Sequence, residues 1–346
     1  ADDRPEVIDA YGASVQRDSL ARELRLFTWP DYMDPALLDE FRSTYGVRVV
    51  VDYYDNNEAL IAKLQAGGLG QYDVIIASDY AAETLGGQQM LVPLDHALIP
   101  NLANLDARFR EMPFDPGNRY TATYQWGTSG LGVRSDRVSG DIQPSWRLVF
   151  EPDEQPGPFA MLADPRETIG AALIYLGHSA NSTEPAELER AEALLMAQRP
   201  RVLTYAPFAS SRDLLASGDV VLAHNYSGDI LMVQEDVPAI RYVIPREGAI
   251  LWTDNMAVPA RAPAPYTAMV FINFILDAEN HAWAAENILY KVPNKVGMEG
   301  LDPSLAEQFP NMGMTPAELT QYELLRDLGP AQPAYSRIVS EIKAAN

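Results

Sequence analysis

The sequence predicts an α/β protein with two domains, and three observations support this. The chain has 346 residues, enough for two domains of ordinary size. Apolar residues make up 47% of it and charged residues 21%, so it can bury sizeable cores. Strand-like and helix-like segments alternate along two stretches of the chain, an order typical of doubly wound sheets.

The first α/β stretch follows residues 1–22, which are polar and charged and which we interpret as a tail or an appended helix. Strands are predicted at 24–29, 47–53 and 72–77, the last uniformly apolar as in a buried parallel sheet. Helices are predicted at 35–45 and 57–64. Asp34 provides a cap for the first of these helices, and Pro35 occupies its first turn.

The second α/β stretch begins with a strand predicted at 159–163. Asp164 and Pro165 mark the start of a helix at 166–176. Further helices are predicted at 186–198, 211–217, 266–276 and 279–289, and further strands at 220–224 and 241–245. No Gly/Ser-rich linker separates the two stretches, so we expect several short crossings between the domains.

Composition narrows the class of partner. The net charge of −22 argues against nucleic acid and anionic membranes, both of which would be repelled. No apolar run reaches the ~20 residues of a membrane helix. Cysteine is absent and the four His are isolated, so we expect neither a metal nor a cofactor. The start at Ala1, without Met or an apolar leader, indicates a mature form after removal of a signal peptide.

Aromatic and acidic residues recur where predicted strands end, and doubly wound sheets bind ligands outside these carboxyl ends. The recurring residues, with no paired Lys or Arg among them, are Trp29, Tyr32, Ser78, Asp79, Tyr80, Asp164, Glu167, Tyr226, Asp229, Trp252 and Asp254. In an extended chain Trp252 and Asp254 point to the same face, and a ring beside a carboxylate suits an organic ammonium. Purely structural roles also fit these residues: a core Trp beside a capping Asp and, for Asp164, a simple helix cap.

Enzyme and iron sites fit the sequence less well. Asp164 and Glu167 have the chemistry of a general acid and base, but at one helix start they face together without an opposing wall. No Ser-His-Asp order surrounds a Gly-x-Ser-x-Gly elbow, and Gly67–Gly70 lacks the Lys-Ser/Thr of a phosphate loop. Tyr53 and Tyr54 are adjacent, as in ferric-ion binders, but a strand places them on opposite faces.

Several motifs of the chain occur together in a known family. They are Leu26–Tyr32, Asp55–Glu58 with Ala62–Leu64, Tyr72–Ile76, Phe114–Asn118, Tyr124–Gly127, Gly130–Val133 and Pro245–Asp254. In combination, from about residue 24 to about residue 330, the chain resembles the periplasmic spermidine/putrescine-binding proteins of bacterial ABC importers. Residues 1–22 fall outside the resemblance.

The resemblance implies a two-lobed, type II periplasmic-binding-protein fold. Each lobe would be a mainly parallel sheet flanked by helices, with the ligand cleft between the lobes. The implied bounds are an N-terminal extension at 1–22, an N-terminal lobe at 23–128 plus 254–298, and a C-terminal lobe at 129–253 plus 299–346. The resemblance further implies a monomeric periplasmic protein, not an enzyme, that captures a polyamine and delivers it to a membrane ABC permease.

By motif, the residues that match cleft positions of the family are Trp29, Tyr32, Ser78, Tyr80, Asp164, Glu167, Tyr226, Asp229, Trp252, Asp254 and Tyr290. Trp252 and Asp254 match the aromatic wall and the principal carboxylate of the family. Asp164 and Glu167 match acids that hold ammonium groups.

The chain departs from the family pattern at Pro30, where Ser or Thr is usual, and at Tyr226, where Trp is usual. Four acids favour spermidine, a triamine, over putrescine. Asp229, which matches the putrescine-preferring branch, and Leu325, near a spermidine-binding Gln, favour the reverse. Another amine such as 4-aminobutyrate or an amino acid stays open, with Arg166 as the candidate for its carboxylate. A polyamine sensor also stays open, as does a hydrolase, although the sequence shows no catalytic arrangement.

Overall fold

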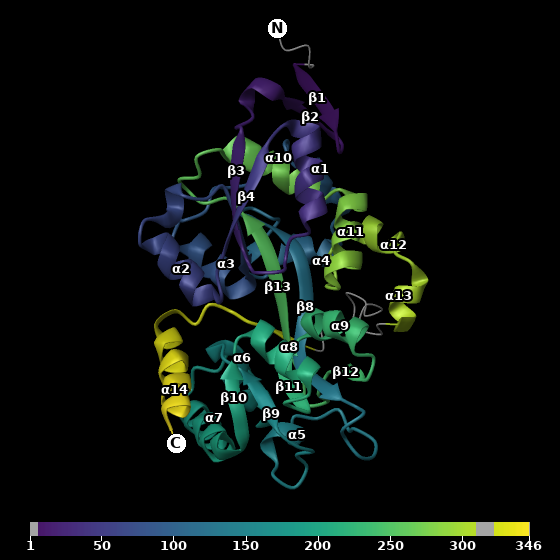
Figure 1. Cartoon of the computed structure of the whole chain (residues 1–346). Coiled ribbons are helices and arrows are strands. Elements are labelled where there is room, and N and C mark those ends of the chain that lie inside the picture. The colour runs from purple at the N-terminus through teal and green to yellow at the C-terminus, as the bar shows by residue number, and fades with distance from the viewer. Residues whose placement is uncertain (1–5, 309–321, 346) are drawn as a thin grey trace. The chain divides into compact units, whose positions relative to one another are not determined.

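The computed structural model describes residues 6–308 and 322–345 (Figure 1). The chain forms two compact units. The first unit comprises residues 1–126 and 253–316, and the second comprises 127–252 and 317–346. Two unit boundaries fall inside long strands, β8 (Thr121–Arg134) and β13 (Ile250–Ala257). The α/β class is confirmed, whereas the lobe bounds inferred from the resemblance stay a prediction.

The sheet of the first unit has the strand order β13-β5-β3-β4. Strands β3 (Glu23–Thr28), β4 (Arg48–Tyr53) and β5 (Val74–Ser78) are parallel, and β13 is antiparallel to β5. This confirms the predicted strand–helix alternation. Every residue of β5 is buried, as its uniformly apolar sequence predicts.

The helices of this unit begin and end where local sequence signals indicate. The main ones are α1 (Pro35–Tyr45), α2 (Asn57–Gln65), α3 (Asp79–Gly87), α10 (Pro265–Ile275), α11 (Ala278–Ile288), α12 (Lys295–Glu299) and α13 (Pro303–Gln308). Helix α1 has the predicted bounds. The Asp34 carboxylate accepts a hydrogen bond from the Ala36 amide at 2.7 Å, and Gly46 ends the helix with φ 73°. Short elements α4 (Ala107–Arg110), β6 (Glu111–Met112) and β7 (Asp115–Pro116) precede β8.

Residues 7–16 form a β-hairpin, so the prediction of a tail or helix before residue 23 is wrong. Strands β1 (Val7–Ala10) and β2 (Ala13–Gln16) pair antiparallel. Tyr11 and Gly12 form the turn, with φ of 50° and 73°. The Tyr11 ring packs edge-on against Phe274, with ring centroids 4.9 Å apart. Because Phe274 is fully buried and the Tyr11 ring packs on it, this contact anchors the hairpin on the first unit.

The sheet of the second unit has the order β10-β9-β11-β8. Strands β9 (Phe159–Leu162), β10 (Val202–Ala206) and β11 (Leu222–Tyr226) are parallel, and β8 is antiparallel to β11. Strand β12 (Ile240–Val243) also pairs with β8, and β14 (Glu323–Leu324) pairs with β13. The helices are α5 (Arg147–Phe150), α6 (Pro165–Tyr175), α7 (Pro185–Gln198), α8 (Phe208–Ser217), α9 (Ser227–Asp236) and α14 (Gln332–Ala344).

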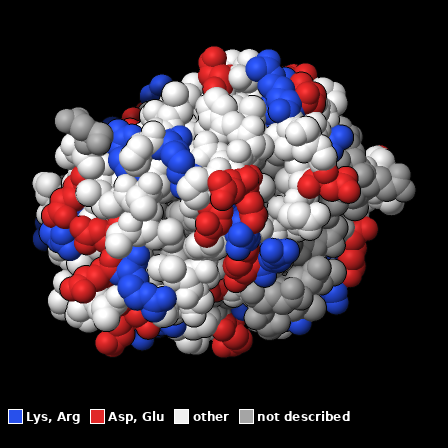
Figure 2. Space-filling model, turned by 90° about the horizontal axis from the view of Figure 1, so that it is seen from below, with Lys and Arg blue, Asp and Glu red and all other residues white. Residues whose placement is uncertain are grey.

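Charged groups of both signs are interspersed on the face of the molecule seen from below in Figure 2. Such mixing is typical of a solvated surface. Within residues 6–308 and 322–345, no helix has both the length and the apolar character that crossing a membrane requires.

Candidate functional site

The central candidate of the first unit is the carboxylate of Asp254. Asp254 on β13 lies directly opposite Ser78, the last residue of β5, in the antiparallel register. The Ser78 hydroxyl donates a hydrogen bond to Oδ1 at 2.6 Å. The Tyr32 hydroxyl, from the loop after β3, donates to Oδ2 at 2.6 Å. Three residues of the predicted set, far apart in sequence, are thus brought together at the carboxyl ends of β3 and β5.

Aromatic rings surround this carboxylate. The Tyr32 ring stands edge-on to Tyr124 and to Tyr290, each with ring centroids 5.6 Å away. The Tyr124 hydroxyl also donates to the Tyr32 carbonyl at 3.1 Å, which fixes the loop. Tyr124 is a residue that sequence analysis did not single out, although it lies in one of the quoted motifs. Its strand was not predicted, so its direction could not be inferred.

Burial makes the ionised form of Asp254 energetically unfavourable. It is 6% exposed, and loss of hydration raises its pKa to about 6, against the opposing effect of the Ser78 and Tyr32 hydrogen bonds. Burial and the nearby Asp254 charge raise the pKa of Tyr32, so this hydroxyl stays a donor. In the described part of the chain no Lys or Arg forms a salt bridge with Asp254. A buried carboxylate held only by hydroxyls has a charge that an organic ammonium can neutralise.

The other predicted residues of the first unit have structural partners. The Asp79 carboxylate accepts hydrogen bonds from the amides of Tyr80 at 2.8 Å and Thr253 at 3.4 Å. The Tyr80 hydroxyl donates to Glu58 at 3.2 Å. Trp29 packs against Tyr54 with ring centroids 4.4 Å apart. Asp79 therefore fixes the start of α3, while Tyr80 and Trp29 add polar and aromatic surface near the same strand ends.

Tyr53 is the last residue of β4 and Tyr54 directly follows it, and their contrasting burial agrees with the predicted opposite faces. Tyr53 is 60% exposed and Tyr54 is 4% exposed, and the Tyr54 hydroxyl donates to the Ile76 carbonyl. Within residues 6–308 and 322–345, no group of three or more His, Cys, Asp or Glu side chains is arranged like a metal site.

In the second unit, Asp164 and Glu167 occupy the start of α6. The Asp164 carboxylate caps the helix by accepting from the amides of Arg166 at 2.8 Å and Glu167 at 3.2 Å. Burial raises the pKa of Asp164 despite these bonds. Glu167 lies 3.9 Å from the ring of His224. Burial lowers the pKa of His224 to about 3, so the ring is neutral at physiological pH.

Tyr226 and Trp252 form an aromatic corner in the second unit. Their rings are edge-on with centroids 5.8 Å apart. Gly127 on β8 makes room for the indole, because a Cβ at this position would lie 2.5 Å from Trp252 Cζ2 and 2.7 Å from Ser227 Oγ. The aromatic wall therefore depends on Gly127, which lies in one of the quoted motifs but whose packing role the sequence did not reveal.

Asp229, in the first turn of α9, is paired. Arg212 of α8 donates from Nη1 to Asp229 Oδ1 at 3.2 Å. Arg212 lies outside the predicted set, so sequence analysis did not foresee that Asp229 has a cationic partner within the protein. Nothing in the local sequence connects positions 212 and 229, because they lie on different helices and meet only through the packing of α8 against α9.

Arg166 is committed to the packing of the second unit. It is fully buried and donates to the Arg326 carbonyl at 2.9 Å, to Gln332 at 3.1 Å and to Asn181 at 2.8 Å. Its guanidinium also lies over the Tyr335 ring, 5.2 Å from the centroid. These contacts join the start of α6 to the C-terminal segment. They weigh against Arg166 as the partner of a ligand carboxylate.

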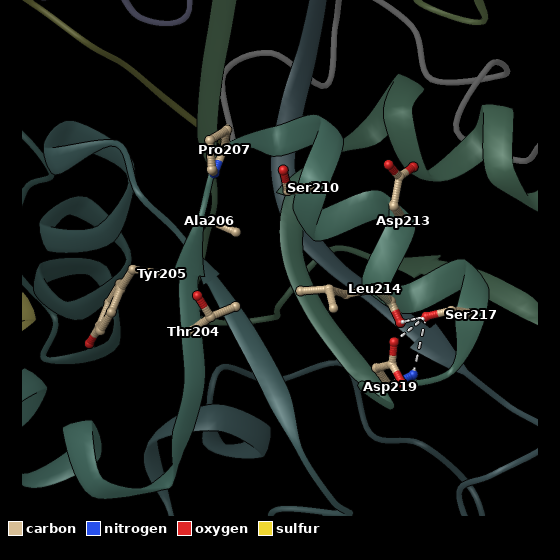
Figure 3. Close-up of a pocket in the computed structure, with 9 residues that line it drawn as sticks. All are labelled: Thr204, Tyr205, Ala206, Pro207, Ser210, Asp213, Leu214, Ser217 and Asp219. Carbon is tan, nitrogen blue, oxygen red and sulfur yellow. Dashed lines mark hydrogen bonds between the residues drawn. The ribbon is translucent and has the colours of Figure 1, made fainter.

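An open cavity of about 550 Å³ lies beside α8, and Figure 3 shows its lining. The lining residues are Thr204, Tyr205, Ala206, Pro207, Ser210, Asp213, Leu214, Ser217 and Asp219. None belongs to the predicted set. Residues 210, 213, 214 and 217 are three or four apart, so one face of α8 borders the cavity and Arg212 belongs to another face.

The family model described as bacterial extracellular solute-binding protein matches residues 36–299. The chain belongs to this family. A putrescine/cadaverine-binding protein of Pseudomonas aeruginosa is 34% identical over 96% of both chains. The spermidine/putrescine-binding periplasmic protein of Escherichia coli is 30% identical, covering 97% of this chain and 95% of the relative.

A solved structure has the same fold. The spermidine/putrescine ABC transporter substrate-binding protein of Streptococcus pneumoniae superimposes with a TM-score of 0.78 at 28% identity, covering 94% of this chain and 99% of that chain. The two-unit α/β structure is thus the periplasmic-binding-protein fold that the resemblance implies. The family is described as extracellular and the Escherichia coli relative as periplasmic, which confirms the predicted periplasmic location.

Proposed function

We propose that this solute-binding protein captures a linear polyamine and delivers it to an ABC permease. The observation that carries the proposal is Asp254, buried among tyrosines and held by the hydroxyls of Tyr32 and Ser78. An ammonium group satisfies such a carboxylate, and aromatic rings bury the methylenes between ammoniums at about 25 cal/mol per Å². The relatives named for putrescine, cadaverine and spermidine support the same ligand class.

Spermidine is our preferred ligand, with putrescine as the second choice. Arg212 holds Asp229, so the other three acids are Asp254, Asp164 and Glu167. These three carboxylates are more than the two ammoniums of putrescine need, which favours spermidine. We therefore propose that the second unit reads the distal ammonium through Asp164 and Glu167 at the start of α6.

The zwitterionic rivals, 4-aminobutyrate and amino acids, would need a cation for their carboxylate. The contacts of Arg166 within the second unit count against them. A catalytic role for Asp164 and Glu167 is also not proposed, because both acids lie at the start of α6 with no opposing acid or base across a reacting group among the residues that the structure describes. A sensor would use the same binding residues, and it is separated from transport by testing whether the loaded protein stimulates ATP hydrolysis by its permease.

Calorimetry and thermal unfolding against putrescine, spermidine, 4-aminobutyrate and glutamate test the ligand class. We expect the two polyamines to raise the Tm by mass action and the zwitterions to leave it unchanged. A Tm shift produced only by a zwitterion at millimolar concentration would refute the polyamine proposal.

The double substitution Asp164→Ala, Glu167→Ala tests the ligand preference. It should weaken spermidine binding far more than putrescine binding, because only the triamine has a third ammonium for these acids to bind. Equal losses for both amines would remove the basis for preferring spermidine.

A further inference from the structure

We propose that Arg212 determines ligand specificity because it pairs with Asp229, which a ligand ammonium would otherwise bind. This inference rests on the proposed polyamine function. Sequence analysis counted Asp229 among the acids that read ligand charge, whereas the structure gives this carboxylate a guanidinium of the protein itself, with Nη1 3.2 Å from Oδ1. A carboxylate that is already paired with a guanidinium attracts a ligand ammonium only weakly, because the ion pair has no net charge.

The environment of the Arg212–Asp229 pair favours a strong interaction between the two side chains. The Arg212 side chain is 18% exposed and that of Asp229 is 3% exposed. Solvent and salt therefore screen this pair less than they screen a surface ion pair. The second acidic neighbour of Arg212, Asp213, has a 76% exposed side chain at 3.6 Å, so it competes weakly for the guanidinium.

The pair lies beside the aromatic corner of the second unit. The Phe208 ring of α8 packs against Tyr226, with centroids 6.2 Å apart, and the Asn225 amide donates to the Phe208 carbonyl at 2.9 Å. These contacts hold the starts of α8 and α9 together, which places Arg212 on Asp229. Asp229 lies in the first turn of α9, where the helix dipole favours a negative charge.

Removal of the guanidinium should open Asp229 to a ligand cation. In Arg212→Gln the carboxylate loses its counter-charge, and the ligand with an additional ammonium can supply a new one. Hydrogen bonds to charged groups are strong enough that the ratio of spermidine to putrescine affinity should rise by roughly tenfold or more. For the same reason spermidine should raise the Tm of the variant by more than it raises the wild-type Tm.

Calorimetry of four proteins with putrescine and spermidine tests the inference: wild type, Arg212→Lys, Arg212→Gln and the double variant Arg212→Gln, Asp229→Asn. Arg212→Lys keeps the charge and should keep the wild-type ratio within about twofold. The double variant lacks both charges and should lose the gain of Arg212→Gln. It also avoids an unpaired buried carboxylate, so it stays folded if the single variant does not.

The outcomes separate this inference from the proposed function. If the wild type binds neither amine, the polyamine function is wrong. If it binds both but Arg212→Gln lowers only the Tm and leaves the affinity ratio unchanged, the pair is structural and the inference is overturned. A gain in ratio that persists in the double variant would also overturn it, because the gain would not pass through Asp229.

Discussion

Asp254→Asn should stabilise the ligand-free protein and weaken ligand binding. Burial raises the pKa of Asp254 from 3.8 to about 6, so folding favours the protonated carboxyl. The protonated carboxyl of Asp254 therefore contributes its full stabilisation of the folded state below pH 3.8, and this contribution is lost as the pH rises to about 6. At about 1.4 kcal/mol per pKa unit, the ionised carboxylate costs the folded state about 3 kcal/mol at pH 7. Asparagine has a similar shape without the charge and removes this cost.

The same substitution should act in the opposite direction on the ligand. An ammonium bound to Asp254 makes charge-assisted hydrogen bonds worth about 1.5–3 kcal/mol, so Asp254→Asn should raise the Kd roughly 10- to 100-fold. Wild-type affinity should itself fall as the pH drops below about 6, where Asp254 becomes protonated. The variant should lack this part of the pH dependence.

Urea unfolding of wild type and variant between pH 4 and 8, together with calorimetry at pH 7, measures both effects. The stability difference should be largest at pH 7 and should shrink toward pH 4. Asp79→Asn is the matched control, because Asp79 is also a buried acid of the first unit. Its carboxylate accepts backbone hydrogen bonds, so replacing it should destabilise the protein. A variant at Asp254 that is less stable than the wild type at pH 7, or that binds spermidine as tightly, would refute the reasoning.

Three further substitutions test other contacts. Gly127→Ala should displace Trp252, whose Cζ2 would lie 2.5 Å from the new Cβ, and should raise the Kd about tenfold as measured by calorimetry; unchanged affinity would show that the indole does not contact ligand. Arg166→Met removes the hydrogen bonds that the fully buried guanidinium donates to Arg326, Gln332 and Asn181, and should lower the free energy of unfolding by about 3 kcal/mol in urea. Tyr11→Ala should cost about 2 kcal/mol through the lost contact with Phe274 and should expose the hairpin to proteases; resistance equal to wild type would show that the ring does not anchor it.

Local sequence signals predicted the helices better than the strands. Residues 35–45 form a helix as predicted, because the cap, the proline and the final glycine all act within the segment. Strand β8 was not predicted, although Ala122, Tyr124 and Trp126 alternate with polar residues, because glycines, which are depleted in strands, interrupt the pattern. Gly130 and Gly132 serve close packing instead: an added Cβ would lie 2.5 Å from the Val243 carbonyl or from Ile230. Such contacts depend on partners more than 90 residues away, which no local window contains.

The candidate site shows the same division between local and distant information. The position of Asp254 near strand ends follows from the sequence pattern and the general rule for doubly wound sheets. Its hydrogen bond to Tyr32 joins residues 222 positions apart, and its raised pKa follows from burial, so neither was predictable. The pairing of Arg212 with Asp229 was missed for the same reason, and it changes the count of acids on which the spermidine preference rested.

The two buried acids, Asp254 and Asp229, show how partner chemistry selects a cation. Hydroxyl donors orient the Asp254 carboxylate but leave its charge uncancelled, so the folded protein carries an electrostatic cost that a bound ammonium removes. The guanidinium at Asp229 cancels the charge within the protein, so no ligand is needed there. The affinity for a cation therefore depends less on the total number of acids than on the number of acids whose hydrogen-bond donors are all neutral. By this reasoning, an arginine is as decisive for the ligand's charge as any of the acids.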